Sequence, residues 1–149
     1  MPEQYILPYT ISNAIAVSLL WLAFRRPNVS RWCIALIFAY ASVFNSYIGI
    51  VRPERYQGFA ELAVLEVYRE FIRGFFRRHA TIMLLTIAAG QAVIALTMAL
   101  GGRLLWIGVL GTCIFLTVII PLWVGSAFPF SLIVSAAAIV LQRKLAAPI

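Results

Sequence analysis

The sequence predicts an all-α membrane protein: a four-helix transmembrane bundle with one additional N-terminal transmembrane helix and an interfacial amphipathic helix. Hydrophobic residues make up 63% of the 149 residues and charged residues only 11%, a balance that excludes an ordinary soluble domain. Five apolar runs approach the length of about 20 residues that a helix needs to cross the hydrocarbon core. The runs show no two-residue alternation, which favours helices, with their internally satisfied backbone, over barrel strands.

The five apolar runs form a single transmembrane domain and extend over residues 6–24, 32–50, 81–100, 104–124 and 127–142. Glu3 precedes the first run and no positively charged segment does, so we expect a retained helix rather than a signal peptide. Pro121 lies inside the fourth run and should kink that helix or end it early, whereas Pro129 lies where the fifth helix would begin, a tolerated position. The fifth run is the shortest, and it either crosses the membrane or re-enters it.

The segment of residues 51–79 is the only long interruption of the apolar pattern, and it holds six of the 12 basic residues and four of the five acidic ones. Charged residues recur at helical spacing from about residue 57 to 79 and apolar residues fill the other face, which predicts an amphipathic connector helix. The connector would either cover the bundle or form a mouth over a ligand pocket. Opposite charges three residues apart are expected to pair, namely Glu66 with Arg69 and Glu70 with Arg73.

Groups that could carry out catalysis are sparse in this sequence. The five apolar runs contain no Asp, Glu, Lys or Arg, which argues against a pump. Cys33 and Cys113 lie in separate runs without CxxC spacing and are expected to be free thiols. His79 is the only histidine and has no carboxylate or thiol at ligand spacing, so the sequence predicts no metal, no cofactor and no catalytic residue. We therefore expect a protein that is not an enzyme by itself.

The net charge of +7 comes largely from short basic clusters at the ends of apolar runs, which are typical of topology signals rather than of a nucleic-acid surface. The connector and the remaining clusters hold equal numbers of basic residues, but connector arginines are partly paired with glutamates. We therefore expect the N-terminus outside and the C-terminus in the cytoplasm of a bacterial or archaeal plasma membrane. The cytoplasmic side would then carry the unpaired clusters, which are Arg25, Arg26, Arg31, Arg103, Arg143 and Lys144.

Four motifs follow one another from the second apolar run onward: SYIGIVRPERY at 46–56, YREF at 68–71, Gly90-Gln91 and LGGR at 100–103. In this arrangement the chain resembles the DoxX-like family of small four-helix integral membrane proteins (DoxX/DoxD/MauE-like). The family includes relatives of the membrane subunit of thiosulfate:quinone oxidoreductase. By this resemblance the run 6–24 is an added helix. Where relatives often place an acidic residue this chain has Gln91, which argues against a quinone-protonating role.

Two functions are compatible with these features. The resemblance and the sparse chemistry favour a non-catalytic membrane subunit or anchor of a larger redox complex, either quinone-linked or not. Its membrane or peripheral partner subunits would contact the charged connector residues Glu66, Arg69, Glu70, Arg73 and Arg77.

The alternative function is a membrane protein that binds a hydrophobic ligand, a lipid or a quinone. Polar side chains in or beside the second and third apolar runs would then hold the headgroup. Gln91 and Asn45 would orient it by hydrogen bonds, beside Tyr47, and Arg52 would face an anionic or carbonyl oxygen. Besides partner subunits and a lipid or quinone, the predicted partner is the lipid bilayer itself, and no nucleic acid is predicted. A transporter is least favoured, because the apolar runs lack charge and show no convincing internal repeat.

Overall fold

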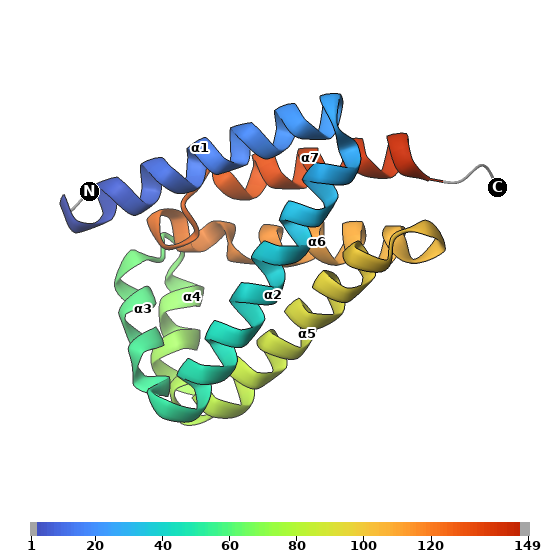
Figure 1. Cartoon of the computed structure of the whole chain (residues 1–149). Helices are drawn as coiled ribbons and strands as arrows, with labels where there is room; N and C mark the ends of the chain where they lie inside the picture. The colour runs from blue at the N-terminus through green and yellow to red at the C-terminus, as the bar shows by residue number, and fades with distance from the viewer. Residues whose placement is uncertain (1–2, 147–149) are drawn as a thin grey trace.

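The structure, a computed structural model, describes residues 3–146 and contains only helices and short connections over that range. Figure 1 shows five long helices, which are α1 (Glu3–Arg25), α2 (Pro27–Val51), α5 (Ala80–Leu100), α6 (Leu105–Ile119) and α7 (Phe130–Leu145). The connector between α2 and α5 consists of η1 (Pro53–Gly58), α3 (Phe59–Leu62), α4 (Glu66–Phe71) and η2 (Ile72–Phe76). Two short 3-10 segments flank α6, namely η3 (Gly102–Leu104) and η4 (Ile120–Ser126). The predicted all-α class is confirmed.

Four helical segments are long and apolar enough to cross a membrane, which indicates an integral membrane protein. They are Glu3–Arg25, Pro27–Val51, Ala80–Leu100 and the combined segment Gly102–Ser126. The fifth predicted run forms α7, which begins at Phe130 and has 16 residues. At 1.5 Å per residue α7 is about 24 Å long, shorter than the hydrocarbon core of about 30 Å.

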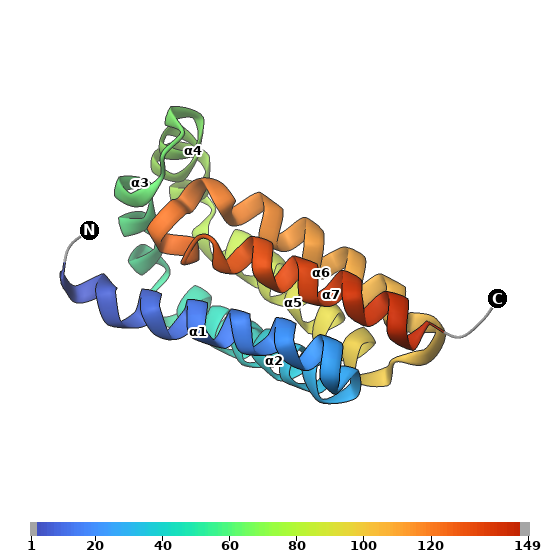
Figure 2. The same ribbon diagram turned by 90° about the horizontal axis from the view of Figure 1, so that it is seen from above.

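The long helices pack as two pairs with α6 between them. Helix α2 lies beside α5, and α1 lies beside α7 (Figures 1 and 2), while α6 contacts both α5 and α7. Helices α1 and α2 meet at their shared turn and diverge toward the connector, which occupies the open end of the bundle (Figure 1). The N-terminal helix packs against α7 and α2.

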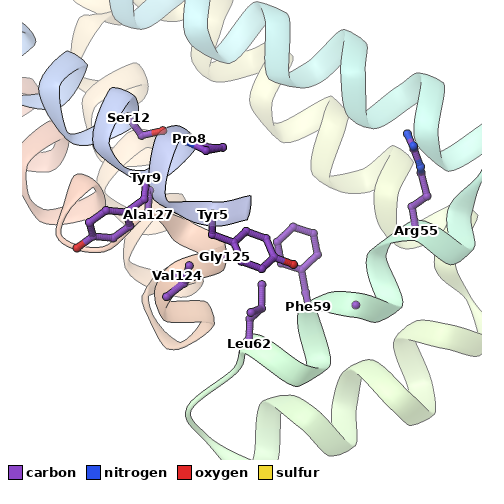
Figure 3. Close-up of a pocket in the computed structure, with 11 residues that line it drawn as sticks. Tyr5, Pro8, Tyr9, Ser12, Arg55, Phe59, Leu62, Val124, Gly125 and Ala127 are labelled. Atoms are coloured by element: carbon purple, nitrogen blue, oxygen red, sulfur yellow. The ribbon is translucent and has the colours of Figure 1, made fainter. Parts of the chain in front are cut away.

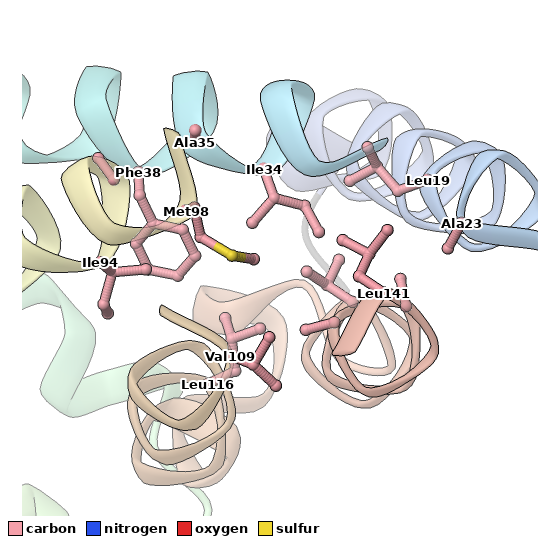
Figure 4. Close-up of a cluster of buried hydrophobic side chains, with 14 of the residues drawn as sticks. Leu19, Ala23, Ile34, Ala35, Phe38, Ile94, Met98, Val109, Leu116 and Leu141 are labelled. Carbon is pink, nitrogen blue, oxygen red and sulfur yellow. The ribbon is translucent and has the colours of Figure 1, made fainter. Parts of the chain in front are cut away.

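The main hydrophobic core lies where all five long helices meet (Figure 4). Alanines of α1 and α7 are completely buried there, so these two backbones approach closely. Gly108 allows α5 and α6 to approach closely, because a Cβ at this position would lie 2.8 Å from Met98 Cγ. Larger side chains fill the centre, among them Ile34, Phe38, Ile94, Met98, Leu116 and Leu141.

Pro121 ends α6, as the sequence predicts. The α-helix stops at Ile119 and continues as the 3-10 segment η4, because proline has no N–H to donate and its ring clashes with the preceding turn. Trp123 and Ala127 then adopt positive φ angles of 50° and 52°, which reverse the chain into α7. The break leaves carbonyl groups at this end of α6 that the connector can reach.

The prediction of one amphipathic helix over residues 57–79 is wrong in its extent, because a non-helical break at residues 63–65 divides the connector, whereas residues 66–78 are continuously helical. Ala63 is buried with an extended backbone, and the Val64 N–H donates to the carbonyl of Pro121 at 2.9 Å instead of to its own helix. Of the two expected ion pairs, Glu66 and Arg69 meet at 2.9 Å, whereas the second pair is absent from residues 3–146. Contacts with η4 thus override the helical periodicity of the connector.

Candidate ligand cavity

An apolar cavity of about 320 Å³ lies between the connector and helices α2, α5 and α6. Its size is at the lower end of the range of about 300 to 1,000 Å³ that is usual for small-molecule sites. No charged side chain lines it, and six of its residues are aromatic. The lining consists of Asn45, Tyr56, Phe59, Tyr68, Phe71, Ile72, Phe76, Ile87, Gln91, Phe115, Val118, Ile119, Leu122 and Gly125.

A small hydrophobic cluster holds the connector onto α2 and α5. Ile48, Phe76 and Leu84 are buried together, and Tyr56 packs against them. Gly49 lets the two helices approach here, since a Cβ would lie 3.0 Å from that of Leu84. The cluster fixes the start and the end of the connector on one side of the cavity.

The other side of the cavity is closed by the end of α6. The Tyr68 hydroxyl donates a hydrogen bond of 2.7 Å to the Val118 carbonyl, beside the bond from Val64 to Pro121. Arg69 stabilises this turn of the connector through a 2.9 Å bond from Nε to the Ala63 carbonyl. The connector thus covers the cavity because the proline break in α6 offers it backbone acceptors.

Three polar side chains form a hydrogen-bonded chain at the cavity wall. The Tyr56 hydroxyl donates to Asn45 Oδ1, and Asn45 Nδ2 donates to Gln91 Oε1 at 2.7 Å. Asn45 is only 7% exposed and Gln91 2%. Both oxygens are used as acceptors, whereas Gln91 Nε2 donates no hydrogen bond within residues 3–146. The chain therefore ends in an amide donor at the cavity.

Tyr56 is held in its neutral form. Burial raises the pKa of its hydroxyl above the usual value of 10.0, because the phenolate would lose its hydration. The hydroxyl remains a donor at neutral pH, which in turn fixes Asn45 with its amide group toward Gln91.

The structure places the four residues of the predicted ligand site in two groups. Asn45 and Gln91 line the cavity and bind each other, whereas Tyr47 and Arg52 do not line it. Tyr47 is 57% exposed because two residues along a helix turn the side chain by about 200°. Arg52 is exposed at the C-terminal end of α2.

Sequence reasoning missed Tyr56, which entered it only as the last residue of the motif at 46–56. The available signal was Asn45 itself, since a buried amide has two polar ends and Gln91 satisfies only one of them. A hydroxyl in the connector was a suitable second partner. Only the folded η1 segment shows that Tyr56 provides it.

A second, more open cavity of about 600 Å³ lies between the N-terminal half of α1, the connector and η4 (Figure 3). Tyr5, Tyr9 and Arg55 contribute polar groups to its wall. Phe59 and Gly125 line both cavities, and a Cβ on Gly125 would lie 2.8 Å from Phe59 Cδ1. The Phe59 ring, packed on bare glycine backbone, is therefore the partition between the two spaces.

The described residues offer little for metal or thiol chemistry. No group of three or more His, Cys, Asp or Glu side chains within residues 3–146 is placed to hold a metal ion. Cys33 and Cys113 are both free and partly buried. The cavity of about 320 Å³ beneath the connector, which we call the inner cavity, is suited to binding a neutral molecule.

The connector residues predicted to face a partner lie outside both cavities. Glu66, Glu70, Arg73 and Arg77 are exposed, and Arg69 is half-buried. Comparisons with protein-family models, with curated proteins and with solved structures give no match. The DoxX-like resemblance therefore stays a prediction.

Proposed function

We propose that this protein binds a hydrophobic small molecule, a lipid or a quinone, in the cavity beneath the connector. The observation that carries the proposal is the unsatisfied amide donor of Gln91 at the wall of an otherwise apolar, aromatic space. Gln91 Nε2 donates no hydrogen bond within residues 3–146, since the only bond of this side chain is the one that Oε1 accepts from Asn45. A ligand oxygen in the cavity would give this amide an acceptor and contribute about 0.5–1.5 kcal/mol.

The lining restricts the chemistry of the ligand. With no charged side chain in the wall, a charged headgroup would lose its hydration without compensation. A carbonyl or ether oxygen on a flat or branched apolar body suits the amide donor and the aromatic rings. Quinones and lipid esters are two classes of molecule that combine these features.

The proposed placement in the membrane follows the sequence. Helices α1, α2, α5 and α6 span the bilayer with α7 packed beside them, and the connector lies at the outer interface. The N-terminus is outside and the C-terminus in the cytoplasm, in a bacterial or archaeal plasma membrane. The ligand then occupies the outer half of the bilayer.

Gln91→Leu tests this proposal. We expect a short-chain benzoquinone to bind about tenfold more weakly, because about 1.4 kcal/mol of hydrogen bonding is removed. Binding is measured by quenching of tryptophan fluorescence in mild detergent, and mass spectrometry identifies lipophilic molecules that co-purify from native membranes. Gln57→Leu is the matched control, because Gln57 is an exposed connector residue that lines neither cavity.

The double variant Asn45→Leu with Gln91→Leu guards against misfolding, because it removes both amides and leaves neither unpaired. Loss of binding in this variant with an unchanged melting temperature supports the site. Unchanged retention of every lipophilic molecule in both variants would reject it.

The second candidate is a membrane subunit or anchor of a larger redox complex, either quinone-linked or not. The connector favours it, because exposed apolar side chains such as Val64 and Val67 lie among charges that form no ion pair within residues 3–146, namely Glu70, Arg73 and Arg77. Photo-crosslinkers at these three positions, used in native membranes, should then capture one stoichiometric protein. Capture of lipid alone would reject the subunit hypothesis.

A further inference from the structure

A groove runs along α2 and α5 on the outside of the bundle, away from both cavities. Its volume is about 390 Å³. The floor consists of the buried alanines Ala35 and Ala95, and the walls include the exposed side chains of Leu36 and Leu96. Small floor residues between large wall residues give an apolar channel open to the lipid.

The length of the groove distinguishes a lipid chain from a partner helix. It follows α2 from Trp32 to Val43, which is about 16 Å at 1.5 Å per residue. This is about half of the hydrocarbon thickness of about 30 Å, so the groove extends over one leaflet. A transmembrane helix from a second copy would need a complementary surface along its whole span.

A cation lies at one end of the groove. Trp32 and Ala99 both line that end, and both contact Arg31. The Arg31 guanidinium carbon lies 5.2 Å from the centre of the Trp32 ring, and Arg31 Nη1 donates to the Ala99 carbonyl at 2.7 Å. Arg31 Nη2 donates no hydrogen bond within residues 3–146, which leaves its N–H groups for an anion.

Gly101 makes this position of the guanidinium possible. Its φ angle of 64° favours glycine, and a Cβ would lie 2.8 Å from Arg31 Nη1. The guanidinium thus binds the C-terminal carbonyls of α5, where a cation also suits the helix dipole. Arg31 is fixed at the groove rather than free to extend into solvent.

The charged residues at the end of the bundle that carries Arg31 are all basic. The end of the bundle that carries it, opposite the connector, holds six basic residues and no acidic residue among residues 3–146, whereas the acidic residues described all lie at the connector end. Three exposed tryptophans lie near the same end, as expected at a headgroup layer. The basic residues are Arg25, Arg26, Arg31, Arg103, Arg143 and Lys144.

We infer that this groove is a binding site for an anionic phospholipid of the adjacent leaflet, with one acyl chain along the alanines and the phosphate group at Arg31. Charge complementarity selects the anionic headgroup, and the length of the groove matches the depth of an acyl chain in one leaflet. The site is separate from the inner cavity and does not depend on the proposed ligand there.

The test compares phosphatidylglycerol with phosphatidylcholine of identical chains, added to delipidated protein in neutral detergent. Bound lipid is counted by native mass spectrometry. The unaltered protein should bind phosphatidylglycerol about tenfold more tightly, and Arg31→Gln should abolish that preference, because charge-assisted hydrogen bonds to phosphate are lost. Ala92→Leu, which fills the groove at an exposed position, should weaken the binding of both lipids several-fold.

Two variants serve as matched controls. Arg78→Gln removes an exposed arginine at the connector end, and Ala136→Leu enlarges an exposed alanine of α7 that lines none of the cavities described above. Neither should change lipid binding.

Three results would overturn the inference. They are equal binding of the two lipids, an unchanged preference in Arg31→Gln, and unchanged lipid binding in Ala92→Leu together with loss of a dimer. The last result would assign the groove to a second copy of this chain. If Arg31→Gln does not fold, because Arg31 also binds the end of α5, Ala92→Leu and Ala39→Leu decide the question.

Discussion

Gln91 and Asn45 show how two neutral amides can order a membrane-buried site without any charge. Their hydrogen bond links α5 to α2, and the Tyr56 hydroxyl links both helices to the connector. Such bonds between transmembrane helices average only about 0.6 kcal/mol. Here these bonds occupy both amide oxygens as acceptors. The amide nitrogen of Gln91, a residue that lines the cavity, is the donor left without a partner within residues 3–146.

Tyr56→Phe tests this chain at a single atom. We expect a destabilisation of about 1–3 kcal/mol, because Asn45 Oδ1 would be buried without a donor. Thermal unfolding in mild detergent measures the difference. Tyr40→Phe, at an exposed tyrosine of α2, should leave stability unchanged.

The contribution of the Tyr56 hydroxyl to stability should decrease only as the pH rises. The folded state raises the pKa of Tyr56, so the stabilisation is fully present below the unfolded value of about 10 and disappears as pH rises through the higher folded value. The stability difference between the unaltered protein and Tyr56→Phe should therefore be constant from about pH 6 to about pH 9 and shrink above about pH 10. A difference that falls already at neutral pH would contradict this assignment.

Gly108 and Gly90 form a matched pair of helical glycines. A methyl group at Gly108 would lie 3.0 Å from the Met98 backbone nitrogen, whereas a methyl group at Gly90 meets nothing within 4 Å. Gly108→Ala should destabilise by about 1–3 kcal/mol through overpacking, and Gly90→Ala should stabilise by up to about 1 kcal/mol through helix propensity. Equal effects in thermal unfolding would show that α5 and α6 do not approach as closely as described.

At the scale of elements, the connector depends on the end of α6. Pro121 breaks α6, and the hydrogen bonds from Val64 and Tyr68 then join the connector to that break. The cavity exists because the connector spans this gap instead of continuing as one helix. Local periodicity is overridden by a backbone contact between segments about sixty residues apart.

Tyr68→Phe should loosen the connector without unfolding the bundle. The variant loses the bond to the Val118 carbonyl, which is worth about 0.5–1.5 kcal/mol. We expect hydrogen exchange of the amides in residues 59–71 to become about two- to tenfold faster, with α2 and α5 unchanged. Tyr47→Phe is the control. Equal exchange in the variant and the unaltered protein would mean that the connector is held elsewhere.

At the scale of the whole molecule, acidic residues are confined to one end among residues 3–146. The connector end carries both signs of charge, and the opposite end is only basic. Counts of Lys and Arg are equal at the two ends, so the positive-inside rule gives no majority. We propose that the end without acidic residues lies in the cytoplasm.

Cysteine labelling tests this orientation. On a background with Cys33 and Cys113 replaced by alanine, Gln57→Cys should react with an impermeant maleimide in intact cells. Asn28→Cys, in the turn between α1 and α2, should react only after lysis. The reverse pattern would place the connector in the cytoplasm and would also move the proposed lipid groove to the outer leaflet.

The sequence alone determined the helical class, the position of the apolar segments and the end of α6, because length, hydropathy and proline act locally along the chain. It also identified Asn45 and Gln91, since amides in apolar runs need partners. The tertiary structure decided the broken connector, the packing of α1 against α7, the role of Tyr56 and the exclusion of Tyr47 and Arg52 from the cavity. These features depend on which surfaces meet, and contacts between distant segments are not encoded in any one local pattern.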